Sequence, residues 1–168
     1  DGMQWLDRLR HMPSVGAATA RVQTTAMITS PTRSEPLMLI GVSPESEQQV
    51  TFLHKSVKEG RYLQSGHDRE IVIGRKLAEL LQVRLGERVV VMAQDINGSL
   101  ASEAFVVAGL FNTGGHGFDK AVGQVTLPAA QNMLGMGNRV TNIALRAQDK
   151  EQLGAIVQQA EAMLPAGD

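Results

Sequence analysis

The residues best suited to chemistry lie in one glycine-rich stretch after the middle of the chain. It consists, in order, of Asn112, Thr113, Gly114, Gly115, His116, Gly117, Phe118 and Asp119. The stretch offers an imidazole and a carboxylate three residues apart on flexible backbone, an arrangement that does occur in active-site loops. One hypothesis is therefore a small α+β enzyme that uses His116 and Asp119 as acid and base. The other is a mobile loop whose apolar anchor, Phe118, captures a partner or cargo.

Other catalytic arrangements find little support in the sequence. There is no cysteine, which excludes thiol catalysis, cysteine-ligated zinc and disulfides. The four histidines, at positions 11, 54, 67 and 116, do not share the spacing of metal ligands. Neither a Gly-x-Ser-x-Gly motif nor a phosphate-binding loop is present. We therefore expect no catalytic residues, no metal and no cofactor.

Acidic pairs and methionines each admit a plain interpretation beside a functional one. Glu45 with Glu47 and Asp68 with Glu70 lie in polar segments, which favours solvated charges over acid–base pairs. The methionines could form a surface that accepts hydrophobic ligands, because the thioether is flexible and polarizable. Gap-filling within the core is the commoner use of such residues. Those on apolar faces are Met27, Met38, Met92, Met133 and Met163.

Composition limits the class of protein and its partners. The 168 residues are about one domain's worth, and 43% hydrophobic with 20% charged residues is typical of a globular protein. A net charge of −1 and an aromatic content of 4% argue against nucleic acid as a partner. The chain opens Asp1-Gly2-Met3 and stops at Gly167-Asp168, so we expect it to be a segment of a longer protein.

The elements that would position these residues follow from periodicity and turn signals. Helices are expected at 3–12, from Gly74 with Leu77, Leu80 and Leu81 on one face, and from Pro128 to Gly135. Asn97-Gly98 favours a hairpin with a type I′ turn, which requires positive φ at both residues. Segment 43–49 is expected to be a polar stretch and 112–117 a loop. Expected strands are 19–29, 37–42, 70–73, 88–93, 104–111, 122–127 and 141–147.

The last helix has the clearest pattern. Asp149 can cap it, and its apolar residues recur at helical spacing: Leu153, Ile156, Val157, Ala160, Met163 and Leu164. The two ends of the chain thus frame a strand-rich insert. We predict an α+β fold with two subdomains, in which residues 1–60 plus 138–168 form a discontinuous outer α/β subdomain. Residues 61–137 form the inserted, strand-rich subdomain.

Six short runs, in order, resemble the periplasmic core domains of MacB/FtsX-type ABC transporter permeases. The first two are Gly41-Val42-Ser43-Pro44-Glu45 and Val57-Lys58-Glu59-Gly60-Arg61-Tyr62-Leu63. The others are 70–78 (EIVIGRKLA), 83–89 (VRLGERV), 105–111 (FVVAGLF) and 125–131 (VTLPAAQ). Lipoprotein-releasing permeases of the LolC/LolE type are the most similar. Each run alone is a weak signal, whereas six in order within one domain-sized span are a strong one.

The resemblance implies a porter-like outer and a sabre-like inserted subdomain, placed between membrane helices on the periplasmic face of the bacterial inner membrane. It implies a non-catalytic module in an integral membrane protein. The expected partners are a cognate ABC ATPase subunit and a second permease subunit, in a homo- or heterodimer. A lipoprotein, a periplasmic chaperone or an outer-membrane factor is the expected cargo or partner. The short loop 112–119 lacks the proline-rich hook with which some relatives grip a chaperone.

Overall fold

A computed structural model describes residues 2–163, apart from the side chains of Lys150 and Met163. Its strands are β1 (Val15–Thr29), β2 (Ser34–Val42), β3 (Val57–Gly60), β4 (Glu70–Gly74), β5 (Arg88–Gln94), β6 (Leu100–Phe111), β7 (Val122–Thr126) and β8 (Asn142–Ala147). Its α-helices are α1 (Gly2–Arg10), α2 (Pro44–Val50), α3 (Arg75–Leu81), α4 (His116–Ala121), α5 (Leu127–Leu134) and α6 (Leu153–Met163). Single 3₁₀ turns lie at Leu53–Ser56 and Lys150–Gln152.

The strands form one mixed sheet that closes on itself. Its order is β2-β7-β4-β6-β5-β1-β8, with β3 added beside β6. Because β1 pairs with β2 as well as with β5, the path from β2 to β1 forms a closed barrel. The β2–β7 and β4–β6 pairs are parallel, and the other pairs are antiparallel. Closure removes the exposed strand edges that an open sheet would leave.

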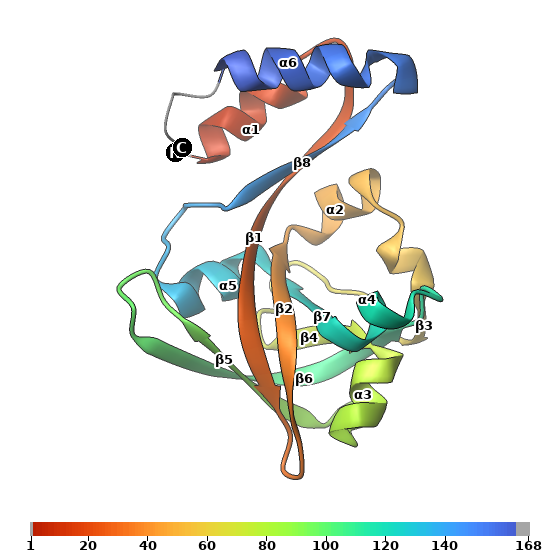
Figure 1. Cartoon of the computed structure of the whole chain (residues 1–168), viewed down its shortest axis with the longest axis vertical. Helices are drawn as coiled ribbons and strands as arrows, with labels where there is room; N and C mark the ends of the chain where they lie inside the picture. Colours follow the sequence, from red (N-terminus) through yellow and green to blue (C-terminus); the bar gives the residue numbers. More distant parts are fainter. Residues whose placement is uncertain (1, 164–168) are drawn as a thin grey trace.

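Strand β1 is long because it serves two parts of the molecule. Its first residues, from Val15 to Arg21, pair with β8, and residues Arg21–Thr29 pair with β2. Figure 1 shows β1 rising out of the barrel to meet β8, with α1 and α6 at that end of the molecule. Leu6 of α1 and Ile156 of α6 are buried in the same hydrophobic cluster as the barrel interior. One core therefore runs from the barrel into this terminal end.

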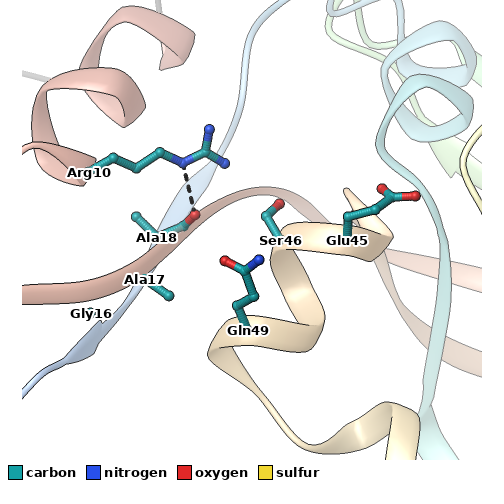
Figure 2. A pocket seen from close by; sticks show the side chains of 7 residues that line it. All are labelled: Arg10, Gly16, Ala17, Ala18, Glu45, Ser46 and Gln49. Atoms are coloured by element: carbon teal, nitrogen blue, oxygen red, sulfur yellow. Dashed lines mark hydrogen bonds between the residues drawn. The ribbon is translucent and has the colours of Figure 1, made fainter.

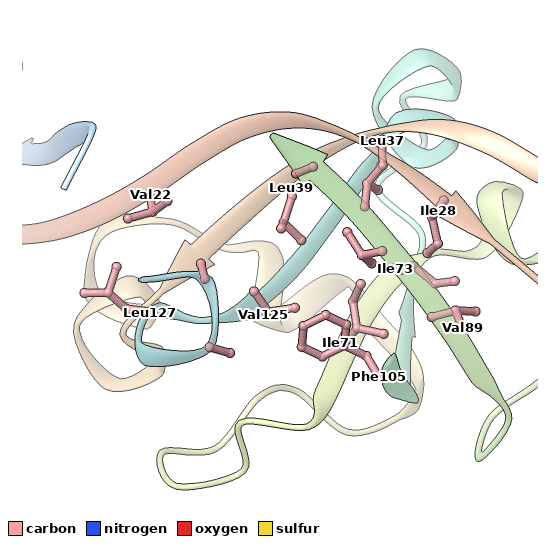
Figure 3. Close-up of a cluster of buried hydrophobic side chains, with 14 of the residues drawn as sticks. Val22, Ile28, Leu37, Leu39, Ile71, Ile73, Val89, Phe105, Val125 and Leu127 are labelled. Carbon is pink, nitrogen blue, oxygen red and sulfur yellow. The ribbon is translucent and has the colours of Figure 1, made fainter. Parts of the chain in front are cut away.

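Alternation along the strands separates an inner from an outer wall of the barrel. Inward residues such as Ile28, Leu39, Ile71 and Phe105 fill the interior, as Figure 3 shows. The outward neighbours on β2, β4, β6 and β7 belong to a second buried cluster. That cluster comprises Val42, Leu53, Leu63, Val72, Phe111 and Val122. Residues 51–63 and α4 lie over this part of the wall, which we call the covered face.

None of the residues from 2 to 163 provides such a cover for the outward side of β1, β5 and the neighbouring parts of β2 and β6, which we call the bare face. One cross-strand row consists of Ser34, Thr29, Val90 and Ala104. The next row consists of Pro36, Met27, Met92 and Ser102. Met27 is 41% exposed and Val90 is 38% exposed. Two of the chain's methionines thus lie on the surface, whereas Met133 packs against the core.

Several expectations from sequence need correction. The polar stretch, for which no helix was predicted, forms helix α2; Pro44 sits in its first turn, where the missing N–H costs nothing. Leu80 is 39% exposed, so the buried side of α3 is formed by Leu77 and Leu81. Leu153 and Val157 of α6 are also exposed, while Ile156 is buried. The predicted position of Leu164 lies outside the described residues.

The predicted hairpin at Asn97-Gly98 is present, but the predicted turn type, I′, is wrong. Gly98 has φ of 82°, whereas Asn97 does not have positive φ, as a type I′ turn would demand. The N–H of Gly98 donates to the Asp95 carbonyl (3.0 Å), and the Asp95 N–H donates to Ser99 (2.8 Å). The Asp95 carboxylate also accepts from the N–H groups of Asn97 and Ser99, both at 2.9 Å. That side-chain acceptor favours the longer turn.

The α+β class is as predicted. The division into subdomains at residues 60 and 138 stays a prediction. β8 does share the sheet with β1, as that division requires. However, β2 from the predicted outer part also pairs with β7 from the predicted insert. The hydrogen-bonded sheet thus crosses the predicted boundary.

Candidate functional site

The predicted contact stretch 112–119 is half loop and half helix. Asn112 to Gly115 form the loop, and His116 begins α4. Gly114 has φ of 83°, which glycine adopts without strain. α4 lies directly over β4, because a Cβ on Gly74 would stand 1.9 Å from the Asp119 carbonyl oxygen. The absence of a side chain at Gly74 therefore permits this close approach of α4 to β4.

Asp119 holds this loop together from inside. It is 2% exposed. Its carboxylate accepts from the Thr113 N–H (3.0 and 3.1 Å), the Thr113 hydroxyl (2.7 Å) and the Gly114 N–H (3.2 Å). A buried carboxylate with this many donors is stabilised as a structural acceptor. His116 is exposed to solvent at the first position of α4, whereas the carboxylate of Asp119 is buried and occupied by the loop donors. The geometry therefore gives the acid–base hypothesis for His116 and Asp119 no support.

Phe118 is the exposed apolar residue of the stretch. Its side chain is 42% exposed, and its ring packs on that of Phe111, with centroids 5.6 Å apart at 50°. Phe111 itself is fully buried in the covered face. Phe118 thus covers the core with one side of its ring and presents the other side to solvent. A role for 112–119 in partner contact stays a prediction.

A second polar site, which sequence reasoning missed, lies where β1 changes partners. Arg21 is opposite Asn142 of β8 and opposite Val42 of β2. Its guanidinium donates from Nη2 to Oε1 of Glu47 (2.6 Å) and from Nε to Oε2 (3.1 Å). Glu47 lies on α2, is almost fully buried, and also accepts from the Thr51 hydroxyl (3.2 Å). This two-pronged ion pair ties α2 to β1, and we call it the junction clamp.

Further polar contacts surround the junction clamp. The hydroxyls of Thr19 on β1 and Ser46 on α2 are 3.0 Å apart. The Tyr62 hydroxyl donates to Gln124 on β7 (2.6 Å). Burial raises the pKa of the Tyr62 phenol well above its ordinary range, and the negative charge of Glu47 raises it further. Tyr62 therefore stays a neutral donor, which fixes the covering segment to the barrel.

The prediction of solvated acidic pairs was right for one member of the first pair and wrong for the other. Glu45 is exposed, whereas Glu47 forms the junction clamp. In the second pair, Asp68 accepts from the Thr126 hydroxyl (2.6 Å), and Glu70 forms an ion pair with Arg61. The signal for Glu47 was Pro44, three residues earlier. A proline in the first turn with acidic residues beside it marks a helix start.

A shallow polar hollow of about 430 Å³ opens beside the junction clamp. Arg10 of α1, residues 16–18 of β1, and Glu45, Ser46 and Gln49 of α2 line it (Figure 2). The Arg10 Nε donates to the Ala18 carbonyl (3.3 Å), which links α1 to β1 across the hollow. Within residues 2–163, no group of His, Asp and Glu side chains is arranged to hold a metal ion. Because α1, the start of β1 and α2 line the hollow, it lies at the boundary between the terminal end and the barrel.

Comparison with known proteins identifies the family. The family model of the MacB-like periplasmic core domain matches residues 2–163. The chain belongs to this family. The resemblance seen in the sequence is thereby confirmed. No helix within the described range is long and apolar enough to cross a membrane.

Individual relatives agree with the membership of the MacB-like family. Lipoprotein-releasing system transmembrane protein LolC of Xylella fastidiosa (strain 9a5c) is 27% identical over 146 residues. That match covers 83% of this chain and 35% of LolC, so the chain spans about a third of the relative.

Solved structures share the fold. The extracellular domain of the noncanonic ABC-type transporter YknZ from Gram-positive bacteria has a TM-score of 0.74 at 17% identity, covering 96% of this chain and 80% of that one. The periplasmic region of MacB from Actinobacillus actinomycetemcomitans has a TM-score of 0.66 at 13% identity, covering 94% and 70%.

Proposed function

We propose that this domain is the extracytoplasmic part of an ABC transporter permease, which couples ATP-driven motion to the handling of a cargo or partner outside the cytoplasm. The observation that carries the proposal is the family match, which extends from residue 2 to residue 163. The similarity to LolC over 146 residues supports a lipoprotein as the cargo. In this proposal the domain itself catalyses no reaction. The hydrolysis of ATP belongs to a separate subunit or domain.

The architecture supports a coupling role. α1 and α6 lie at one end of the molecule (Figure 1), and β1 runs without a break from that end into the barrel. The junction clamp adds a buried ion pair at the point where β1 passes between the two parts. A buried ion pair with two hydrogen bonds holds one geometry, since separating it leaves an uncompensated charge. A displacement of the terminal end is therefore transmitted to the barrel and its covering segment.

The stretch 112–119 is our candidate for contact with the cargo or partner. It is anchored through Asp119, and it presents Phe118, which is 42% exposed. A half-exposed aromatic ring on a firmly held loop can bind an apolar group without first paying to order the loop. We propose the periplasmic face of the inner membrane as its location, with a second permease subunit beside it.

The test uses the full-length protein together with its cognate ABC ATPase subunit. We expect the protein in the membrane fraction, the ATPase to copurify with it, and proteoliposomes of the pair to release a bound lipoprotein when ATP is added. Replacing residues 2–163 by a short Gly/Ser linker should leave membrane insertion intact and abolish release. A full-length protein found only in the soluble fraction, or release that survives the linker replacement, would overturn the proposal.

A further inference from the structure

The bare face differs from an ordinary protein surface in its charge. The two cross-strand rows defined above contain no charged residue, and the flanking outward positions Thr25, Gln94 and Leu100 are uncharged as well. A surface of eleven residues would ordinarily carry about three charges, because charged residues make up about a quarter of a chain and concentrate outside. Leu100 is 75% exposed. Charge begins one row beyond, at Arg88.

Like the buried cluster of the covered face, the bare face carries no charged side chain, although its two rows also contain Thr29, Ser34 and Ser102. On the covered face, outward Val72 and Phe111 are fully buried beneath residues 51–63 and α4. On the bare face, outward Met27 and Val90 occupy equivalent positions of the pleat and face solvent. A neutral apolar centre bordered by charged residues is the anatomy of a protein–protein contact. Adjacent methionines suit such a contact, since they repack easily against a varied surface.

The size of the bare face decides which kind of partner it fits. Strand spacing and rise give it an area of roughly 300 Å². A stable complex between molecules free in solution buries about 800 Å² on each partner. The bare face is too small to hold a free partner. It is large enough to form a contact between molecules that are already held together elsewhere, because tethering raises the effective concentration to the millimolar range.

We infer that the bare face is a symmetric contact between two copies of this chain, held side by side by the membrane parts of the proposed permease pair. This inference rests on the proposed function. A two-fold axis places the same residues of both copies against each other. Charged residues in such a patch would meet their own kind, so a patch without charge is the self-compatible solution. The contact is weak and reversible, and the tether supplies the rest of its stability.

The test is cysteine cross-linking in the full-length protein in membrane vesicles. The domain contains no cysteine, so Met27→Cys and Ser102→Cys each introduce one defined thiol on the bare face. With a short bismaleimide we expect a product of twice the subunit mass from one or both variants. Glu79→Cys on α3, whose side chain is 54% exposed, is the control for random encounters. Adding Val90→Glu to the cross-linking variant should lower the yield at least threefold, because the two introduced carboxylates face each other.

Three outcomes would overturn the inference. These are equal yields from Glu79→Cys and the bare-face variants, a product with a protein of different mass, and no product although native mass spectrometry still finds two copies in the complex. The last outcome leaves the proposed function standing. Loss of the pair itself, or absence of the protein from the membrane, would instead remove the proposed function together with the inference.

Discussion

The outer wall of one barrel is built in two ways, and the difference lies in what covers it. On the covered face, Val72, Phe111 and Val122 are buried by residues 51–63 and α4. On the bare face, Met27, Val90 and Leu100 are exposed. Both sets of residues are uncharged, so charge alone does not distinguish them. The covered face has an additional segment of chain packed over it, whereas no described segment packs over the bare face.

The difference predicts very unequal losses of stability when a large side chain is truncated to alanine on each face. This is the largest effect expected. Phe111→Ala should lower the free energy of unfolding by about 3–5 kcal/mol, because it leaves a cavity beneath the covering segment. Met27→Ala should lower it by less than about 0.5 kcal/mol, since Met27 is 41% exposed and its truncation leaves no enclosed cavity. Urea denaturation of both variants beside the parent measures each value. Comparable losses would mean that the bare face is packed in the monomer and that the comparison fails.

The second prediction concerns the junction clamp, which fastens the start of the covering segment. Glu47→Ala removes one partner and leaves the Arg21 guanidinium largely buried without its carboxylate. We expect the free energy of unfolding to fall by about 3 kcal/mol. This is the low end for a broken buried ion pair, because the Arg21 side chain is 21% exposed. Glu79→Ala on α3 is the control, since an exposed pair contributes about 0.5 kcal/mol or less.

Hydrogen exchange refines the result for Glu47. If α2 and residues 51–63 form one covering unit, their amides should lose protection together in Glu47→Ala, while β5 and the bare face keep theirs. Uniform loss of protection across the barrel would show that the clamp stabilises the whole fold. The separation between the two faces would then be wrong at the level of local stability.

The parts of the fold that sequence predicted best are those with local signals. The periodicity of 153–163, the strand at 88–94 and the Gly135 terminus of α5 all needed only neighbours in the chain. Barrel closure did not follow from such signals. It depends on the pairing of β2 with β7, in which Met38 of β2 lies opposite Val122 of β7, a residue far away in the sequence. Strand alternation predicts which residues share a side, but it does not predict which strands meet.

The candidate site was predictable to a similar extent. The glycines and polar residues of 112–119 located an exposed stretch with Phe118 at its surface. The role of Asp119 could not be predicted, because its burial depends on the packing of α4 over Gly74, which brings together residues far apart in the sequence. Glu47 was missed for the same reason. A carboxylate next to polar neighbours looks solvated until the arginine that pairs with it, 26 residues earlier, is brought to it by the sheet.

The third prediction tests the hairpin that borders the bare face. Gly98 has φ of 82°, and no atom lies closer than 3.6 Å to a Cβ built there. Gly98→Val should therefore cost about 1–2 kcal/mol through backbone strain alone. Gly98→Asn should cost less, because asparagine tolerates positive φ. Equal urea midpoints for the valine variant and the parent would show that the hairpin end adopts another turn in solution.

The smallest effect is expected at Phe118, where the covered face reaches the surface. The ring lies on Phe111, but 42% of the side chain is exposed. Phe118→Ala therefore loses part of one aromatic contact and little burial, about 1 kcal/mol. Phe118→Leu, which keeps apolar contact with Phe111, is the matched control for stability.

If Phe118 is also the anchor for cargo, the alanine variant of the full-length protein should impair transport far more than so small a destabilisation can explain. Unfolding of the alanine variant would place Phe118 in the core. Normal transport with normal stability would remove 112–119 from partner contact and leave Phe118 as the outermost residue of the covered face.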